Sequence, residues 1–98
     1  MKTFVKDPDA TLDYEFDWSK WLATSGNDTI SQSSWDIKPL GASTETLSLS
    51  GVPTISNGVT SAFFEGGALG ERYRITNSII TSAGRIDERS FVLEIKEK

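Results

Sequence analysis

The feature that most restricts the fold is a strict alternation of apolar and acidic residues near the N-terminus. The segment 12–18 reads Leu-Asp-Tyr-Glu-Phe-Asp-Trp, with every even position large and apolar and every odd position acidic. Successive side chains of a β-strand point to opposite faces of the sheet, whereas a helix repeats its apolar residues about every 3.6 positions. The segment therefore predicts a half-buried strand whose outer face carries Asp13, Glu15 and Asp17.

The same period of two recurs along the chain. It predicts further strands over 29–37, 46–51 and 59–65, and then a long terminal hairpin with arms over 72–79 and 90–96. Ile30 has the opposite parity to the rest of its strand, which indicates either a β-bulge or an outward-facing Ile30. The only helical feature expected is a single turn capped by Ser19.

Two details favour an immunoglobulin-like sandwich over other all-β folds. Tyr73 opens the penultimate strand, where such domains have a tyrosine corner, and Ile75 then stands at the position of the second cysteine of antibody domains. Trp35, on an early strand, is expected to be the central core tryptophan. We therefore predict one all-β domain over 1–98, an immunoglobulin-like β-sandwich of about seven short antiparallel strands.

The composition excludes several classes of function. The chain contains no cysteine and no histidine, so thiolate chemistry, cysteine metal sites and histidine-based triads are excluded. The net charge is −4, and the basic residues form no stripe that could bind phosphates, so nucleic acid is not an expected partner. The first eight residues lack the apolar core of a signal peptide, and no run reaches membrane-spanning length, so we expect an unprocessed soluble product without a membrane partner.

The acidic residues near the N-terminus suggest a cation site or a carboxylate pair, but neither is favoured. Ca²⁺ takes about 6–8 oxygen ligands, whereas alternate residues of one strand lie about 6.5–7 Å apart and form a stripe. A glycosidase pair needs a cleft, for which this chain has little room. The segment 66–70 is glycine-rich but lacks the lysine of a phosphate loop, and it is expected to be a flexible turn. We predict no catalytic residue, no metal ligand and no cofactor.

The terminal hairpin and one tryptophan are the remaining candidates for binding. The charges of Arg85, Asp87, Glu88 and Arg89 either neutralise one another on the hairpin surface or form a docking element, since arginine is enriched in interface hot spots. Trp21 lies outside the strand alternation and is either part of the core rim or an exposed aromatic anchor. For the four hairpin charges and for Trp21, the structural interpretation and the binding interpretation both remain open.

In several motifs taken together, the sequence resembles the family of small tailed-phage fibre–tail adaptor proteins. The most specific is the Gly-Arg-Ile-Asp-Glu-Arg-Ser-Phe segment over 84–91, and no motif matches over 39–58. The resemblance covers nearly the whole chain, and the other motifs that carry it are Lys6–Asp9, Leu12–Tyr14, Asp17-Trp18, Thr29-Ile30, Ser34-Trp35 and Tyr73-x-Ile75-Thr76-Asn77.

The resemblance implies a non-catalytic virion or prophage protein, present in several copies, that joins the tail to the fibre or baseplate. Its partners would be other phage structural proteins, and it would reach the virion after synthesis in the host cytoplasm. We expect the hairpin over 83–91 and the acidic face of the first alternating strand to carry these contacts. The alternatives are a capsid decoration domain and a carbohydrate-binding or adhesin-type sandwich that uses exposed aromatic residues such as Trp21 and Phe64.

Overall fold

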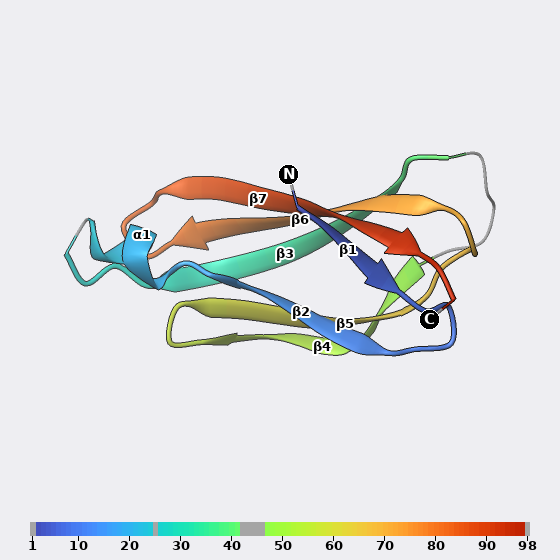
Figure 1. Cartoon of the computed structure of the whole chain (residues 1–98). Helices are drawn as coiled ribbons and strands as arrows, with labels where there is room; N and C mark the ends of the chain where they lie inside the picture. The colour runs from blue at the N-terminus through green and yellow to red at the C-terminus, as the bar shows by residue number, and fades with distance from the viewer. Residues whose placement is uncertain (1, 25, 42–46, 98) are drawn as a thin grey trace.

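The computed structural model describes residues 2–24, 26–41 and 47–97. It is an elongated all-β domain of 43 × 21 × 19 Å with one short helix, as Figure 1 shows. In chain order the elements are β1 (Thr3–Lys6), β2 (Leu12–Asp17), α1 (Ser19–Ala23), β3 (Ile30–Pro39), β4 (Leu47–Ser56), β5 (Val59–Gly66), β6 (Arg72–Thr81) and β7 (Ile86–Ile95). Within the described ranges, no helix has the length and apolar character needed to cross a membrane.

The strands form two stacked sheets in the order of an immunoglobulin-like sandwich. One sheet runs β1-β7-β6-β3 and the other runs β2-β5-β4, which confirms the predicted sandwich. The prediction of antiparallel pairing throughout was wrong for β1, which pairs parallel to β7 with Thr3 opposite Val92. Parallel neighbours need a long connection between them, and here almost the whole domain lies between β1 and β7 and supplies it.

The tyrosine corner is present. The Tyr73 hydroxyl accepts a hydrogen bond from the Ala68 N–H at 2.9 Å, and Tyr73 is only 1% exposed. Gly67, with φ of +98°, lies so close to Ile95 that a Cβ there would be 2.7 Å from its side chain. The predicted flexible turn over 66–70 is therefore a packed corner that joins β5 to β6.

The aromatic core contains Trp35, as predicted, but Trp35 is not its most buried tryptophan. Trp35 is partly buried between the sheets, stacked on Phe16 with 5.9 Å between ring centroids and edge-on to Phe64 at 5.7 Å. Trp18, at the end of the acidic alternation, is fully buried. The sequence pattern places Trp18 on the inner face but gives no measure of its depth.

A buried polar network surrounds Trp18 and ties both sheets together. The indole Nε1 of Trp18 donates to Thr60 Oγ1 and to Asn77 Oδ1, both at 3.2 Å, and Asn77 Nδ2 donates to Ser33 Oγ at 2.9 Å. Thr60 and Asn77 are themselves fully buried. Satisfied networks of this kind fix one arrangement of a core, because each polar group would be costly to bury alone.

Local signals in the sequence are mostly confirmed. Asn57 and Gly58 have φ of 51° and 79°, which suits the tight turn between β4 and β5. The register of β3 against β6 shifts between Ile30 and Gln32, so the predicted bulge is present. Ser19 does not cap α1: it is the first helical residue after Trp18, and its N–H donates to Asp17 Oδ1 at 2.9 Å.

Candidate interaction surfaces

The outer face of the β2-β5-β4 sheet is acidic. Asp13, Glu15 and Asp17 project from β2 and Glu65 from β5, all four exposed, and we call these four residues the acidic face. No lysine or arginine occurs in β2, β4 or β5. Phe63 is 50% exposed and lies directly opposite Asp13 in the β2–β5 register.

Hydrogen bonds at the end of β2 stabilise one charge of the acidic face. The side chain and backbone N–H of Ser19 hold the pKa of Asp17 below its ordinary value, because hydrogen bonds to a carboxylate favour its charged form. Asp17 therefore stays ionised to lower pH than a free aspartate.

The outer face of the other sheet balances its charges. Arg72 pairs with Glu94 at 3.1 Å, and Lys96 contacts the same carboxylate at 3.1 Å, so hydrogen bonds from both cations lower the Glu94 pKa. Lys38 lies opposite Arg74 in register, and Asp36 precedes Lys38 on the same face of β3. This face therefore carries charges of both signs, whereas the strands of the acidic face carry carboxylates alone, with Lys20 and Arg89 near Asp17 and Lys2 in the same hollow as Asp13 and Glu15.

Arg85 holds α1 against the hairpin, and its predicted role in an interface stays a prediction. Its Nε donates to Asp28 Oδ2 at 3.1 Å, and its guanidinium carbon lies 4.0 Å from the centroid of the Trp21 ring. Trp21 is half-buried beneath it and packs beside Trp18. Trp21 is therefore part of the core rim, and its predicted contact with a partner stays a prediction.

Asp28, which the sequence analysis did not single out, is the hub of this contact. Its side chain is only 2% exposed, and it also accepts hydrogen bonds from the N–H groups of Thr29 at 2.9 Å and Ala83 at 3.1 Å. Burial alone raises the pKa of Asp28, but these bonds together with those from Thr81 and Arg85 hold it below its ordinary value. Only the folded chain brings residues 28 and 85 together, so no local pattern indicates the pair.

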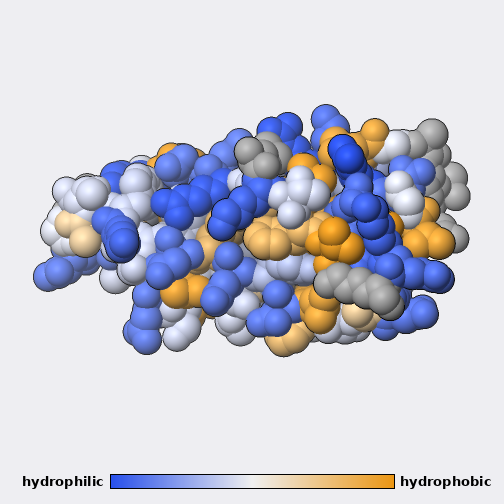
Figure 2. Space-filling view, in the orientation of Figure 1, coloured by the Kyte–Doolittle hydropathy of each residue, from blue (hydrophilic) through white to orange (hydrophobic). Residues whose placement is uncertain are grey.

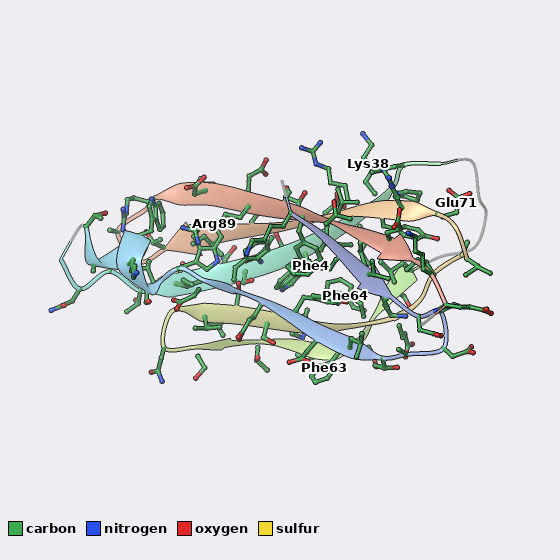
Figure 3. All side chains as sticks on the ribbon, viewed as in Figure 1. Phe4, Lys38, Phe63, Phe64, Glu71 and Arg89 are labelled. Atoms are coloured by element: carbon green, nitrogen blue, oxygen red, sulfur yellow. The ribbon has the colours of Figure 1, made fainter. Side chains whose placement is uncertain are left out.

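Arg89 also faces inward. It lies opposite the buried Asn77 in the β6–β7 register, its guanidinium carbon is 4.1 Å from the centroid of a Trp18 ring, and its Nη1 donates to Asp17 O at 3.0 Å. Figure 3 shows this side chain directed toward the α1 end of the sandwich. We call Arg85 and Arg89, with Asp28, Trp18 and Trp21, the arginine clamp.

The acidic residues of the hairpin do not neutralise these arginines. Asp87 Oδ1 accepts the N–H of Glu88 at 2.8 Å, and Glu88 Oε2 accepts a bond from Ser78 Oγ at 3.4 Å. The interpretation in which the four hairpin charges satisfy one another was therefore wrong. Asp87 and Glu88 are exposed, and their predicted role in an interface stays a prediction.

A second pairing that the sequence does not indicate fixes the end of β1. Lys6 is fully buried, and its Nζ donates to Asp7 O at 2.9 Å and to Gly66 O at 2.8 Å, which ties β1 to the last residue of β5. Burial lowers the pKa of Lys6, and the nearby carboxylates of Asp7, Asp9 and Glu65 partly oppose this shift. The lysine acts as a tie between the two sheets.

A hollow of about 470 Å³ opens between β1, β2 and β7. Its floor is aromatic and its rim is polar, and we call it the slot; it is lined by Lys2, Phe4, Asp13, Tyr14, Glu15, Phe16, Ser90 and Phe91. Phe4 is 39% exposed within it and contacts Tyr14 and Phe91 with 5.5 and 5.4 Å between ring centroids. Figure 2 shows apolar residues gathered at the middle of this face of the molecule.

The other predicted features do not gather into a reactive centre. In residues 2–24, 26–41 and 47–97, no group of three or more histidine, cysteine, aspartate or glutamate side chains is arranged to hold a metal ion. Phe64, expected as an exposed aromatic residue, is fully buried, whereas Phe63 is the exposed neighbour, and Figure 3 shows the two rings on opposite sides of β5. The segment 42–46, part of the unmatched stretch 39–58, lies outside the described residues.

Comparison with known proteins agrees with the resemblance seen in the sequence. No curated protein matches the chain. The family model described as podophage GP4 fiber-tail adaptor protein gp77 matches residues 6–94, which include all of β2 through β6, α1 and nearly all of β7. With this match and an immunoglobulin-like sandwich that carries no recognisable reactive centre in its described residues, the chain belongs to the podophage GP4 fiber-tail adaptor protein family.

Proposed function

We propose that this protein is a non-catalytic adaptor that joins the tail of a phage particle to its fibre or baseplate through protein–protein contacts. The family match over residues 6–94 carries this proposal. The partners are other structural proteins of the particle, and the protein reaches the virion after synthesis in the host cytoplasm. Several copies around a symmetric tail would turn a modest contact into firm attachment.

The surface of the domain supports contact through the acidic face. Asp13, Glu15 and Asp17 are exposed and have no basic residue on their own sheet, although Lys20 and Arg89 lie near Asp17. The carboxylates of Asp13 and Glu15 are therefore the ones best placed to orient a basic partner. Arg85 and Arg89 have internal partners instead. We therefore assign the interface to the acidic face and to the exposed Asp87 and Glu88, with the arginine clamp holding the shape of the domain.

The carbohydrate-binding alternative loses its main support. The two aromatic residues expected to bind sugar are not free to do so, because Phe64 is fully buried and Trp21 lies beneath Arg85; the exposed rings are those of Phe4 and Phe63. Capsid decoration uses the same kind of protein–protein contact at a different address, and the position of the protein in the particle distinguishes it from tail attachment.

The proposal is tested by removing the protein from the particle. Particles produced without it are expected to keep heads and tails but to lack fibres, and mass spectrometry should find the protein in wild-type tails and not in isolated heads. Complementation with Asp13→Lys/Glu15→Lys is expected to restore few fibres, whereas the surface control Arg74→Ala restores them fully. Fibres that attach normally without the protein would overturn the proposal.

A further inference from the structure

The outer edge of β2 is an unpaired strand edge. Along a strand, the N–H and C=O groups of successive residues point alternately to its two sides. The Trp18 N–H donates to Gly58 O on the β5 side at 2.8 Å, so the groups of Asp13, Glu15 and Asp17 point away from β5. The contact of Asp17 O agrees with this direction, because this carbonyl accepts a hydrogen bond from the Arg89 guanidinium on the β7 side.

No strand of the described chain lies on that side of β2. The sheet order ends at β2, with β5 as its neighbour, and β1 lies on the other sheet against β7. The backbone groups of Asp13 and Glu15 are therefore available to a strand from elsewhere. The Arg89 guanidinium donates a hydrogen bond to Asp17 O, so this carbonyl, at the α1 end of the edge, is not available to an added strand.

The other edges are less suited to an added strand. The edge strand β1 is only four residues long, and the edge strand β3 has a register shift between Ile30 and Gln32 and ends at Pro39. On β7, the part not covered by β1 has the Glu88 N–H already bound by the Asp87 carboxylate at 2.8 Å. On β4, the register against β5 shifts between Ser50 and Thr54, and Pro53 lies within the shift. Bulges and prolines are common means of protecting a sheet edge, and β2 has neither.

The surroundings of the β2 edge define the sequence that fits it. A strand paired with β2 points alternate side chains to two faces. One set lies over the slot, whose floor is formed by Phe4, Tyr14 and Phe91, and so must be apolar. The other set lies beside the exposed carboxylates of Asp13 and Glu15, and cross-strand neighbours of opposite charge are favourable.

We propose that the free edge of β2 binds an extended segment of another particle protein, about five residues long, in which lysine or arginine alternates with apolar residues. The segment adds a fourth strand to the β2-β5-β4 sheet, covers the slot with its apolar side chains and pairs its basic ones with Asp13 and Glu15. This inference rests on the proposed adaptor function and specifies how the adaptor holds its partner.

The first test uses a peptide with this pattern, Lys-Val-Lys-Val-Lys-Val-Lys, and the isotope-labelled full chain. The amide resonances of Asp13 and Glu15 are expected to shift and to become protected from hydrogen exchange, whereas the amide of Trp35 on β3 stays unchanged. The peptide Glu-Val-Glu-Val-Glu-Val-Glu should cause no such change. Equal effects of both peptides, or shifts that avoid β2, would overturn the proposal.

Two variants separate strand addition from simple charge attraction. Glu15→Pro removes an N–H that points away from β5, which an edge strand tolerates, and it should weaken peptide binding by about tenfold or more. Asp13→Lys/Glu15→Lys should do the same while keeping the backbone donors. Glu65→Lys makes the same kind of charge change on the same face but away from the edge, and it should change the affinity by less than about threefold.

The outcome in particles distinguishes this inference from the proposed function. Hydrogen exchange of the protein within intact particles should show slow amides at Asp13 and Glu15 that are fast in the free chain. If the protein is required for fibre attachment but these amides exchange equally fast in both states, the strand-addition proposal is wrong and the adaptor function stands. If fibres attach without the protein, the adaptor function is wrong. The peptide titration then decides by itself whether the edge of β2 binds an added strand.

Discussion

Two charged segments that look alike in the sequence have opposite roles in the structure. Arg85, which directly precedes β7, and Arg89 on β7 both lie over tryptophan rings, at 4.0 and 4.1 Å from a ring centroid, and reach acceptors from other parts of the chain. Asp13 and Glu15 on β2 point outward with no cation on their sheet. Both segments were expected to face a partner. The two arginines contact groups of their own domain, whereas the carboxylates of Asp13 and Glu15, like those of Asp87 and Glu88, are exposed.

The difference shows that the cross-strand environment, and not the charge itself, decides whether a side chain is available. The parity of β7 turns Arg89 toward Asn77 and the end of β2, where an aromatic ring and a carbonyl satisfy its guanidinium. The parity of β2 turns its carboxylates away from the core. We expect the clamp to serve only stability and the acidic edge to serve only binding.

The largest effect is expected at the ring beneath Arg89. Trp18→Ala removes a fully buried side chain and leaves Thr60 and Asn77 without their indole donor. The free energy of unfolding should fall by about 3–5 kcal/mol, much of the stability of a small domain. Urea unfolding followed by circular dichroism measures this loss.

Trp35→Phe is the matched control for that measurement. Trp35 Nε1 has no hydrogen-bond partner within the described ranges, so Trp35→Phe removes no hydrogen bond. Trp18→Phe, in contrast, removes the hydrogen bonds from the indole to Thr60 and Asn77. Trp18→Phe should therefore be the more destabilising of the two. The reverse order would mean that the polar network does not stabilise this end of the core.

The sequence predicted the strands and the sandwich because the period of two records which side of a strand is buried. It also located the tyrosine corner at Tyr73 and the turn at Asn57-Gly58, since both depend on local chemistry. It missed the parallel pairing of β1, the burial of Lys6 and the contact of Asp28 with Arg85. Each joins residues far apart in the chain, which periodicity does not report.

The next effect concerns Arg85. Arg85→Ala removes a cation–π contact over Trp21, worth about 0.5–2 kcal/mol, and leaves the nearly buried Asp28 without its cationic partner. The isolated domain should therefore be less stable. Arg74→Ala, at an exposed position of β6, should change stability by less than about 0.5 kcal/mol. If the two substitutions change stability equally, the contacts of Arg85 with Trp21 and Asp28 do not stabilise the domain.

Acid should open the clamp as well, with a smaller effect. Hydrogen bonds lower the pKa of Asp28 below the ordinary value of 3.8, so the unfolded chain binds more protons between the two pKa values and stability rises with pH across that range. Stability should fall as the pH drops from about 4 through the folded pKa of Asp28. In Asp28→Asn this part of the pH dependence should be absent. An unchanged acid unfolding profile in the variant would contradict the assignment.

The smallest effect on stability, and the one that most sharpens the comparison, is expected at the acidic edge. Asp13→Asn/Glu15→Gln removes two like charges from one exposed strand face, so the free energy of unfolding should change by less than about 0.5 kcal/mol, with any gain largest at low salt. The same variant should attach fewer fibres, because a basic partner loses its charge pairs while the strand edge remains. Calorimetry of the free domain and fibre counts on particles measure the two effects separately. A destabilised domain with full fibre attachment would show that the acidic edge stabilises the fold and does not bind the partner.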